Sequence, residues 1–205
     1  YFFINYIKMI NKKLLYASGF FLIISVYFAL NLGCLLSDNY LSTQGMILAA
    51  LNGNIQIGIK NIEYTNKSEQ KTKISDYKCK KDYTIDAISF NLKDTLCEEA
   101  KNSIIPTYIF ISIVLILGFI KVYFISKGKK NIYLDIGLTL SILAIIVMNS
   151  IIVAYIVQLS DRFIIDELGA DSSFAATFAS LAVGGIIFIG LLIEVFYNVY
   201  NKKYN

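Results

Sequence analysis

The chain contains no histidine, no tryptophan and a single proline, and it has few charged residues for its length. Of its 205 residues, 56% are hydrophobic and 17% are charged, whereas a soluble domain usually carries about 25% charged residues. The lack of histidine removes the commonest metal ligand and the commonest general base. The sequence shows no nucleophile–base pair, metal-ligand cluster or phosphate-binding loop. We therefore expect a membrane protein that is not an enzyme and that uses no cofactor or metal.

Four apolar segments are each long enough to cross a hydrocarbon core of about 30 Å, which takes roughly 20 helical residues. They are residues 14–36, 104–124, 136–159 and 174–194. Pro106 falls in the first turn of the second segment, where a missing N–H costs least. Lys121 lies near the far end of that segment, where its long side chain can extend to the membrane interface. The sequence predicts an α-helical membrane protein built as a four-transmembrane-helix bundle.

Lysines in the short connections predict the orientation of the bundle, because cytoplasmic loops of membrane proteins are enriched in them. They precede the first span, fill the turn at 125–135 and follow the last span: Lys12, Lys13, Lys127, Lys129, Lys130, Lys202 and Lys203. The loop at 160–173 instead carries one arginine against four acidic residues. We expect both termini (1–13 and 195–205) and the turn to be cytoplasmic. The loops at 37–103 and 160–173 should then be extracellular.

A cleaved secretory signal is the competing interpretation of the first span. The stretch "NLGC" at 31–34 resembles a bacterial lipoprotein cleavage box, but Asn31 stands where that box needs an apolar residue. The apolar run is also longer than a signal core, which spans about 7–15 residues. Met9 opens a stretch that resembles a natural start, so the first eight residues are either a processed remnant or an upstream extension. We expect the first span to be retained.

Two of the three cysteines, Cys79 and Cys97, lie in the long loop. On an oxidising side of the membrane a disulfide between them would persist. It would close a loop of about 18 residues, worth roughly 3 kcal/mol on the chain-entropy model. Cys34 is then either a membrane-buried thiol or a rival partner, and a redox-active pair would need closer spacing. The sequon Asn66-Lys67-Ser68 agrees with an extracellular loop and predicts a glycan on Asn66.

The long loop shows patterns of regular structure. "NIQIGIKNIEY" alternates isoleucine with polar residues and predicts a strand at about 54–64, followed by a polar turn and a second strand at about 73–79. Ile88, Leu92 and Leu96 fall four apart and predict an amphipathic helix at about 86–101. We expect a small extracellular β-sheet plus a helix. A loosely ordered linker is the alternative, and it would lack this much patterned isoleucine.

The last span is rich in small residues spaced four apart, which let helix backbones approach closely in lipid. These residues are Ala175, Ala176, Ala179, Ser180, Gly184 and Gly185. They should seat the helix within its own bundle, with self-association as the alternative. Asp135 and Glu194 lie near span ends and are expected to be solvated or paired caps rather than an ion path. Asn31 and Asn149 are expected to make polar contacts between helices.

Four spans with a long, strand-bearing first loop that holds a cysteine pair resemble the claudin-like tetraspan superfamily. "ALNLGCLLS" and "LSDRFIIDELGADSSFAATFASLAVGGIIFIGLLIE" are similar to its fungal SUR7/PalI branch, where an arginine, an aromatic and a leucine-glycine-small group precede an alanine-rich span. The matching positions are Arg162, Phe163, Leu168, Gly169 and Ala170. The loop signature of the superfamily is altered here, with Lys60 in place of its tryptophan and Glu63 in place of its first cysteine. Paracellular sealing is therefore not implied.

The resemblance implies a plasma-membrane protein that acts by contacts rather than by turnover. We expect a non-enzymatic tetraspan that organises plasma-membrane or cell-surface assemblies through its outer loop and helix faces. Its expected partners are membrane lipids and other membrane proteins or itself, as a homo-oligomer, and no nucleic acid. A channel-like or auxiliary channel subunit would show polar residues along one helical face. An accessory subunit of a large membrane complex, such as a respiratory assembly, would make long contacts with other chains and need no glycan on Asn66.

Overall fold

A computed structural model of the chain describes residues 2–37, 41–43, 53–59, 61–66, 68–75, 78–79, 82–85, 88–91, 96–162, 168–170 and 172–204. Its long helices are α1 (Phe2–Ser37), α3 (Leu96–Ser126), α4 (Ile132–Arg162) and α5 (Ser172–Tyr204). Each of the four contains a stretch that is long and apolar enough to cross a membrane. The prediction of four candidate membrane helices is confirmed.

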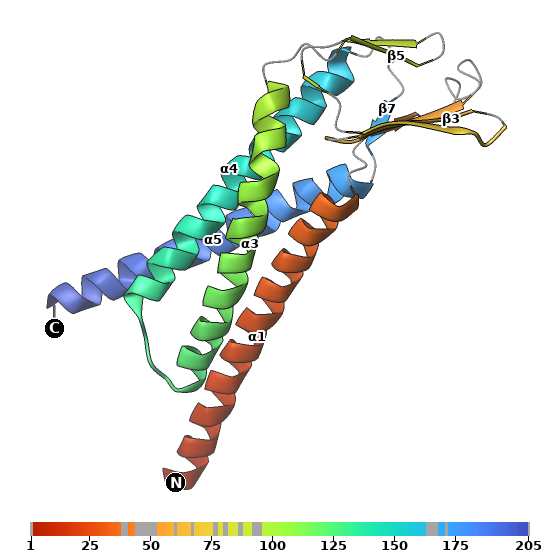
Figure 1. The fold of residues 1–205 in the computed structure, drawn as a ribbon. Coiled ribbons are helices and arrows are strands. Elements are labelled where there is room, and N and C mark those ends of the chain that lie inside the picture. Colours follow the sequence, from red (N-terminus) through yellow and green to blue (C-terminus); the bar gives the residue numbers. More distant parts are fainter. Residues whose placement is uncertain are drawn as a thin grey trace.

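The four helices alternate in direction, so the molecule has two distinct ends (Figure 1). Both termini and the turn at 127–131 lie at one end, which we call the turn end, and the strands lie at the other, the sheet end. Helix α3 packs between α1 and α4, while α5 packs against α4 and α1. The helices extend beyond the predicted spans, since α1 begins at Phe2 and α3 begins at Leu96.

Two local features make the turn between α3 and α4. Gly128 adopts φ +66°, which costs glycine little, and its N–H donates to the Ile125 carbonyl at 2.9 Å. Asn131 then caps α4, since its Oδ1 accepts hydrogen bonds from the backbone N–H groups of Tyr133 (3.1 Å) and Leu134 (3.4 Å). The chain therefore reverses within five residues.

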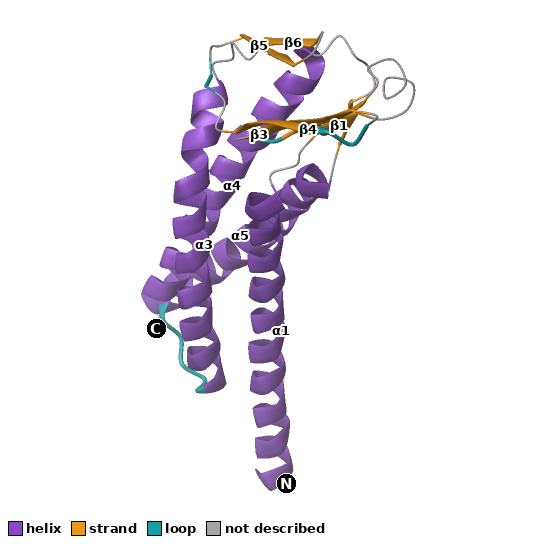
Figure 2. Ribbon diagram, turned by 45° about the vertical axis from the view of Figure 1, so that its right-hand side comes forward, coloured by secondary structure: helices purple, strands orange, loops and turns teal. Residues whose placement is uncertain are grey.

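Two connections lie at the sheet end: the first joins α1 to α3 and the second joins α4 to α5. Segments from both form one antiparallel sheet (Figure 2). Its strands are β1 (Leu41–Thr43), β2 (Gly53–Ile57), β3 (Asn61–Asn66), β4 (Lys71–Ser75) and β7 (Leu168–Ala170), in the order β4-β3-β2-β1-β7. A separate hairpin is formed by β5 (Asp82–Ile85) and β6 (Ile88–Asn91). Strand β7 comes from the second connection and pairs with β1 from the first. The sheet therefore joins the two connections.

Three details of the predicted loop were wrong. The strand predicted at 54–64 is two strands, β2 and β3, because the chain reverses at Gly58, whose N–H donates to the Asn61 carbonyl at 2.8 Å. The second strand, β4, starts at Lys71 rather than at residue 73 and ends at Ser75. The helix predicted at 86–101 is replaced by β6 and by the start of α3. Isoleucine and phenylalanine in "ISFN" favour a strand and outweigh the four-residue spacing.

One face of the sheet packs against the helices. Strand alternation places Ile57, Ile62 and Tyr64 on that face, and all three are buried, together with Ile59 from the turn. Their neighbours in the same cluster come from the sheet-side ends of two helices: Ala100 and Ile104 of α3, and Ile152, Tyr155 and Ile156 of α4. Each fully buried isoleucine contributes about 1.5–3 kcal/mol. The sheet is therefore fixed to the bundle by its own apolar face.

The small residues of the last span divide into two groups. A Cβ added at Gly184 would lie 2.9 Å from the Tyr27 hydroxyl of α1 and 3.2 Å from Ile146 of α4, so glycine is what lets the three helices meet. Ser180 is buried, and Ala176 and Ala179 are half-buried. Ala175 is exposed, and a Cβ at Gly185 would meet nothing within 4 Å. Ala175 and Gly185 are therefore not at the close helix contact that Gly184 makes.

Gly184→Ala should destabilise the bundle, whereas Gly185→Ala should not. The added methyl at Gly184 forces Tyr27 or α5 to shift, and overpacking of this kind costs about 1–3 kcal/mol. The matched change at Gly185 enters open space. Thermal unfolding of both variants in mild detergent measures the difference. Equal unfolding midpoints would contradict the close contact between α5 and α1.

Candidate functional site

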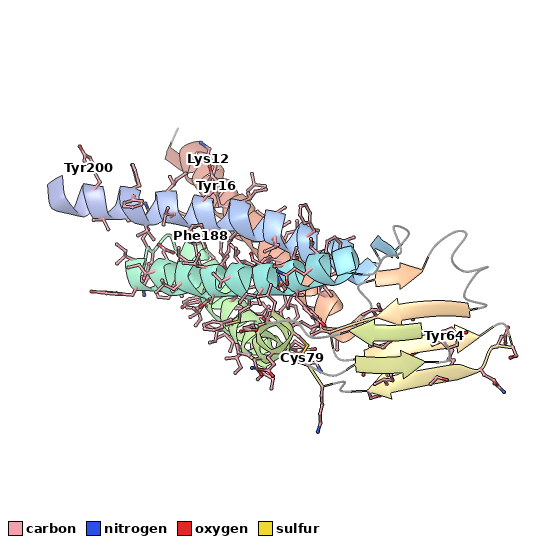
Figure 3. The ribbon with its side chains drawn as sticks, turned by 90° about the horizontal axis from the view of Figure 1, so that it is seen from above. Lys12, Tyr16, Tyr64, Cys79, Phe188 and Tyr200 are labelled. Carbon is pink, nitrogen blue, oxygen red and sulfur yellow. A yellow bond between two sulfur atoms is a disulfide. The ribbon has the colours of Figure 1, made fainter. Side chains whose placement is uncertain are left out.

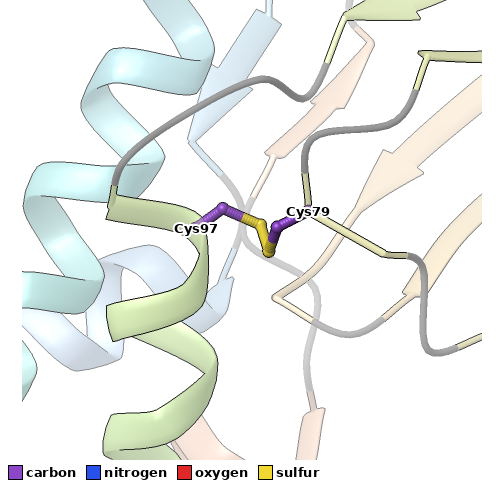
Figure 4. The surroundings of a disulfide bond; sticks show 2 residues. All are labelled: Cys79 and Cys97. Atoms are coloured by element: carbon purple, nitrogen blue, oxygen red, sulfur yellow. A yellow bond between two sulfur atoms is a disulfide. The ribbon is translucent and has the colours of Figure 1, made fainter.

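A disulfide ties the sheet to the bundle. Cys79 follows β4 and Cys97 lies in the first turn of α3, and their sulfurs are bonded, with Cα atoms 5.8 Å apart and a sequence separation of 18 (Figure 4). The predicted pairing is confirmed. Cys97 is completely buried, and Cys79 packs on the same apolar cluster as the isoleucine face. The bond therefore reinforces a junction that hydrophobic packing already makes.

The third cysteine lies outside this bond. Cys34 is buried in α1, and its thiol donates to the Leu30 carbonyl at 2.9 Å. Of the two alternatives left open by the sequence, Cys34 as a rival disulfide partner is not observed, and the thiol is buried within the protein. Asn66, the predicted glycan site, is the last residue of β3 and pairs through its backbone position with Gly53. The sequon thus spans the connection between β3 and β4, where Ser68 is exposed.

The residues that carry the family resemblance fall at the second connection. Leu168, Gly169 and Ala170 form β7, in register with Thr43, Ser42 and Leu41 of β1. Arg162 is the last residue of α4, and Phe163 lies outside the described residues. The leucine-glycine-small group is therefore an edge strand that fastens the second connection to the first.

The sheet turns a polar face away from the helices. We call this the polar face and define it by Gln56, Glu63, Lys71 and Lys73. Gln56, Glu63 and Lys73 are cross-strand neighbours on β2, β3 and β4. Lys71 Nζ lies 3.1 Å from Glu63 Oε1, in an exposed ion pair that contributes little stability. Since both lysines lie on an edge strand, they also discourage unspecific strand pairing.

Inside the bundle, polar side chains connect three helices. Asn149 of α4 donates to the Asn31 side-chain oxygen of α1 at 2.8 Å and to the Ser180 hydroxyl of α5 at 3.2 Å. All three residues are buried. The predicted contact between Asn31 and Asn149 is confirmed, and Ser180 extends it to the last helix. Interhelical hydrogen bonds of this kind contribute about 0.6–2 kcal/mol each in lipid.

Near the turn end, three charged residues form an ion triad, of which two are buried: Lys121 of α3 and Asp135 of α4, with Glu194 of α5 partly exposed. Lys121 Nζ lies 2.7 Å from Asp135 Oδ1 and 2.6 Å from Glu194 Oε2. The lysine and aspartate side chains are each only 5% exposed, and that of the glutamate is 40% exposed. The ammonium also lies 5.1 Å from the ring centroid of Phe20 on α1. A single lysine therefore contacts side chains from all the other helices of the bundle.

The triad corrects one prediction and confirms another. Lys121 points into the bundle rather than outward, because two carboxylates and an aromatic face lie within its reach there. The expectation that Asp135 and Glu194 are paired caps is confirmed, with Lys121 as the partner of both. In the sequence these three residues are only separate charges near the ends of the spans, and nothing there indicates that they pair. Their convergence depends on how the helices pack.

Breaking the disulfide should loosen the sheet without affecting the spans. Cys79→Ser with Cys97→Ser removes a cross-link over 18 residues, worth about 3 kcal/mol. Cys34→Ser, which alters a thiol outside the bond, is the matched control and should change the unfolding midpoint little. Peptide mapping under non-reducing conditions should recover one linked pair, Cys79 with Cys97. A linked peptide that contains Cys34 would contradict the structure.

Removing the lysine of the triad should destabilise the bundle strongly. Lys121→Met leaves the buried carboxylate of Asp135 without a partner, and breaking such a pair costs about 3–5 kcal/mol. Neutralising the acids as well, with Asp135→Asn and Glu194→Gln, should restore most of the loss. Thermal unfolding midpoints of the single and triple variants in detergent test this. A triple variant no more stable than the single one would argue against the ion triad.

No protein-family model matches the chain, and a search of curated proteins finds no match. What the chain does is therefore argued from the geometry of the sheet and the bundle.

Proposed function

We propose that the protein is a non-enzymatic, claudin-like tetraspan, close to the SUR7/PalI type, that organises plasma-membrane or cell-surface assemblies through its sheet. The observation that carries the proposal is the sheet itself. Both connections at the sheet end contribute strands to it, and it packs on the helices through buried isoleucines. Its polar face is left turned away from the bundle.

A fixed sheet of this kind suits binding rather than turnover. The residues of the polar face (Gln56, Glu63, Lys71 and Lys73) are half-buried or exposed, and they carry charges of both signs. The disulfide and the isoleucine face already hold the backbone of the sheet. Binding a partner would therefore cost little free energy for ordering that backbone. Electrostatic complementarity across such a face provides specificity more than raw affinity.

We further propose that the sheet end is extracellular. Lysines gather at the opposite end, in Lys12 and Lys13 of α1 and in the turn that holds Lys127, Lys129 and Lys130, and cytoplasmic loops are enriched in lysine. The disulfide belongs to the sheet end, and disulfides persist in oxidising compartments. The sequon at Asn66 lies at the same end, which supports a glycan there.

The orientation predicts opposite labelling of two introduced cysteines. Thr72 is exposed on β4 and Lys127 is exposed at the turn end. In intact cells a membrane-impermeant maleimide should label Thr72→Cys, and it should label Lys127→Cys only after the membrane is permeabilised. Labelling in the reverse order would place the sheet in the cytoplasm and would also exclude a glycan on Asn66.

The binding role predicts that a charge reversal on the polar face removes partners without unfolding the protein. Glu63→Arg changes that face, whereas Glu99→Arg makes the same charge change on the exposed first turn of α3. Cross-linking followed by mass spectrometry should recover neighbouring proteins at least about tenfold less with Glu63→Arg than with the wild type. The reason is that loss of one important contact weakens binding about tenfold. Equal recovery for both variants, with the wild-type level of neighbours, would contradict a binding role of the sheet.

A further inference from the structure

The turn end contains a cavity of about 560 Å³ between α1, α3, α4, α5 and the α3–α4 turn. Its apolar wall includes Tyr16 and Phe20 of α1, Phe124 of α3 and Leu134 of α4. Figure 3 shows Tyr16 on α1, far from Tyr64 and Cys79 at the sheet end. Tyr16 is 72% exposed, so the cavity reaches the surface of the bundle beside an aromatic side chain. It lies at the ends of the candidate membrane spans, where lipid headgroups would be.

Charged residues occupy the rest of the wall: the ion triad, together with Lys13, Lys129 and Lys130. The two acids are already bound to Lys121. Among the residues that the structure describes, neither Lys13 nor Lys129 contacts a carboxylate. Lys130 donates to the Asn198 side-chain oxygen at 3.2 Å, lies 5.5 Å from the ring centroid of Tyr197 and interacts electrostatically with Asp135. Four lysines and two carboxylates line the cavity, so its wall carries a net charge of +2.

Lys13 is directed at the turn rather than into open solvent. A Cβ added at Gly128 would collide with the Lys13 ammonium, so this lysine of α1 reaches across to the α3–α4 turn. Lys129 and Lys130 follow in that turn. Cations from two distant parts of the chain therefore meet at one side of the cavity, while aromatic and aliphatic side chains form the other side.

We propose that this cavity binds an anionic phospholipid, with the phosphate headgroup at Lys13 and Lys129 and the glycerol and first acyl carbons against Tyr16 and Phe20. A cationic rim over an apolar wall matches an amphiphile with a negative head, and basic pockets between membrane helices bind anionic headgroups. The triad itself carries one net negative charge, from two acids against one lysine, and the three further lysines of the wall leave the cavity net positive. The proposal concerns the turn end and does not rest on the function proposed for the sheet.

The test uses two double variants with the same loss of charge. Lys13→Gln with Lys129→Gln removes the cavity lysines, whereas Lys12→Gln with Lys127→Gln removes exposed lysines that do not line the cavity. The full chain is purified in detergent and titrated with phosphatidylglycerol or phosphatidylcholine. Binding is measured by native mass spectrometry and by the shift of the thermal unfolding midpoint.

Phosphatidylglycerol should bind and stabilise the wild type, and the cavity variant should bind it about tenfold more weakly. The control variant should stay within about twofold of the wild type, and a Lys13→Arg with Lys129→Arg variant should retain binding. Equal losses in both glutamine variants would overturn the site in favour of general surface attraction. Equal binding of phosphatidylcholine would overturn the requirement for negative charge, and full competition by inorganic phosphate would replace the lipid by a free anion.

Discussion

The contact between the isoleucine face of the sheet and the ends of α3 and α4 is the interaction on which the arrangement of this protein depends. Ile57, Ile62 and Tyr64 are buried there, in a cluster that contains Cys97 of α3 and Tyr155 of α4. An isolated small sheet is marginally stable, and packing against a helix is what gives it independent stability. The opposite face of the sheet is polar, with Glu63 and Lys73 as charged cross-strand neighbours. The proposed binding role rests on this difference between the apolar face and the polar face of the sheet.

At the turn end an ion triad adds to the burial of apolar side chains, which include Leu134, Leu138 and Leu191. In lipid the hydrophobic effect does not drive helices together, so hydrogen bonds and close packing must do so. Lys121 meets Asp135 and Glu194 there, and Gly184 lets α5 approach Tyr27 nearer the middle of the bundle. These contacts hold the ends of the helices that line the lysine-rimmed cavity. Both ends thus combine apolar packing with one specific tie: the disulfide at the sheet end and the ion triad at the turn end.

The sequence predicted what depends on local pattern and missed what depends on pairing over long distances. Apolar runs identified the four candidate membrane helices, and the cysteine pair was identified by its shared loop. Strands β1 and β7 have three residues each and lie more than 120 residues apart in the sequence, so no periodicity could indicate them. The inward direction of Lys121 depends on Glu194, 73 residues away. Gly118, which lets Ile24 of α1 pack closely on α3, likewise carries no sequence signal of its own.

Amide hydrogen exchange of the sheet, with the protein in lipid nanodiscs, tests most directly whether the sheet and the bundle form one fixed unit. The buried strand β3 pairs on both sides, with β2 and β4, and its Ile62 and Tyr64 lie against the helices. We expect β3 amides to exchange orders of magnitude more slowly than those of an unfolded chain, and to regain fast exchange only when the disulfide and the isoleucine face are disrupted together. Exchange of β3 at the rate of an unstructured linker in the intact protein would contradict this expectation.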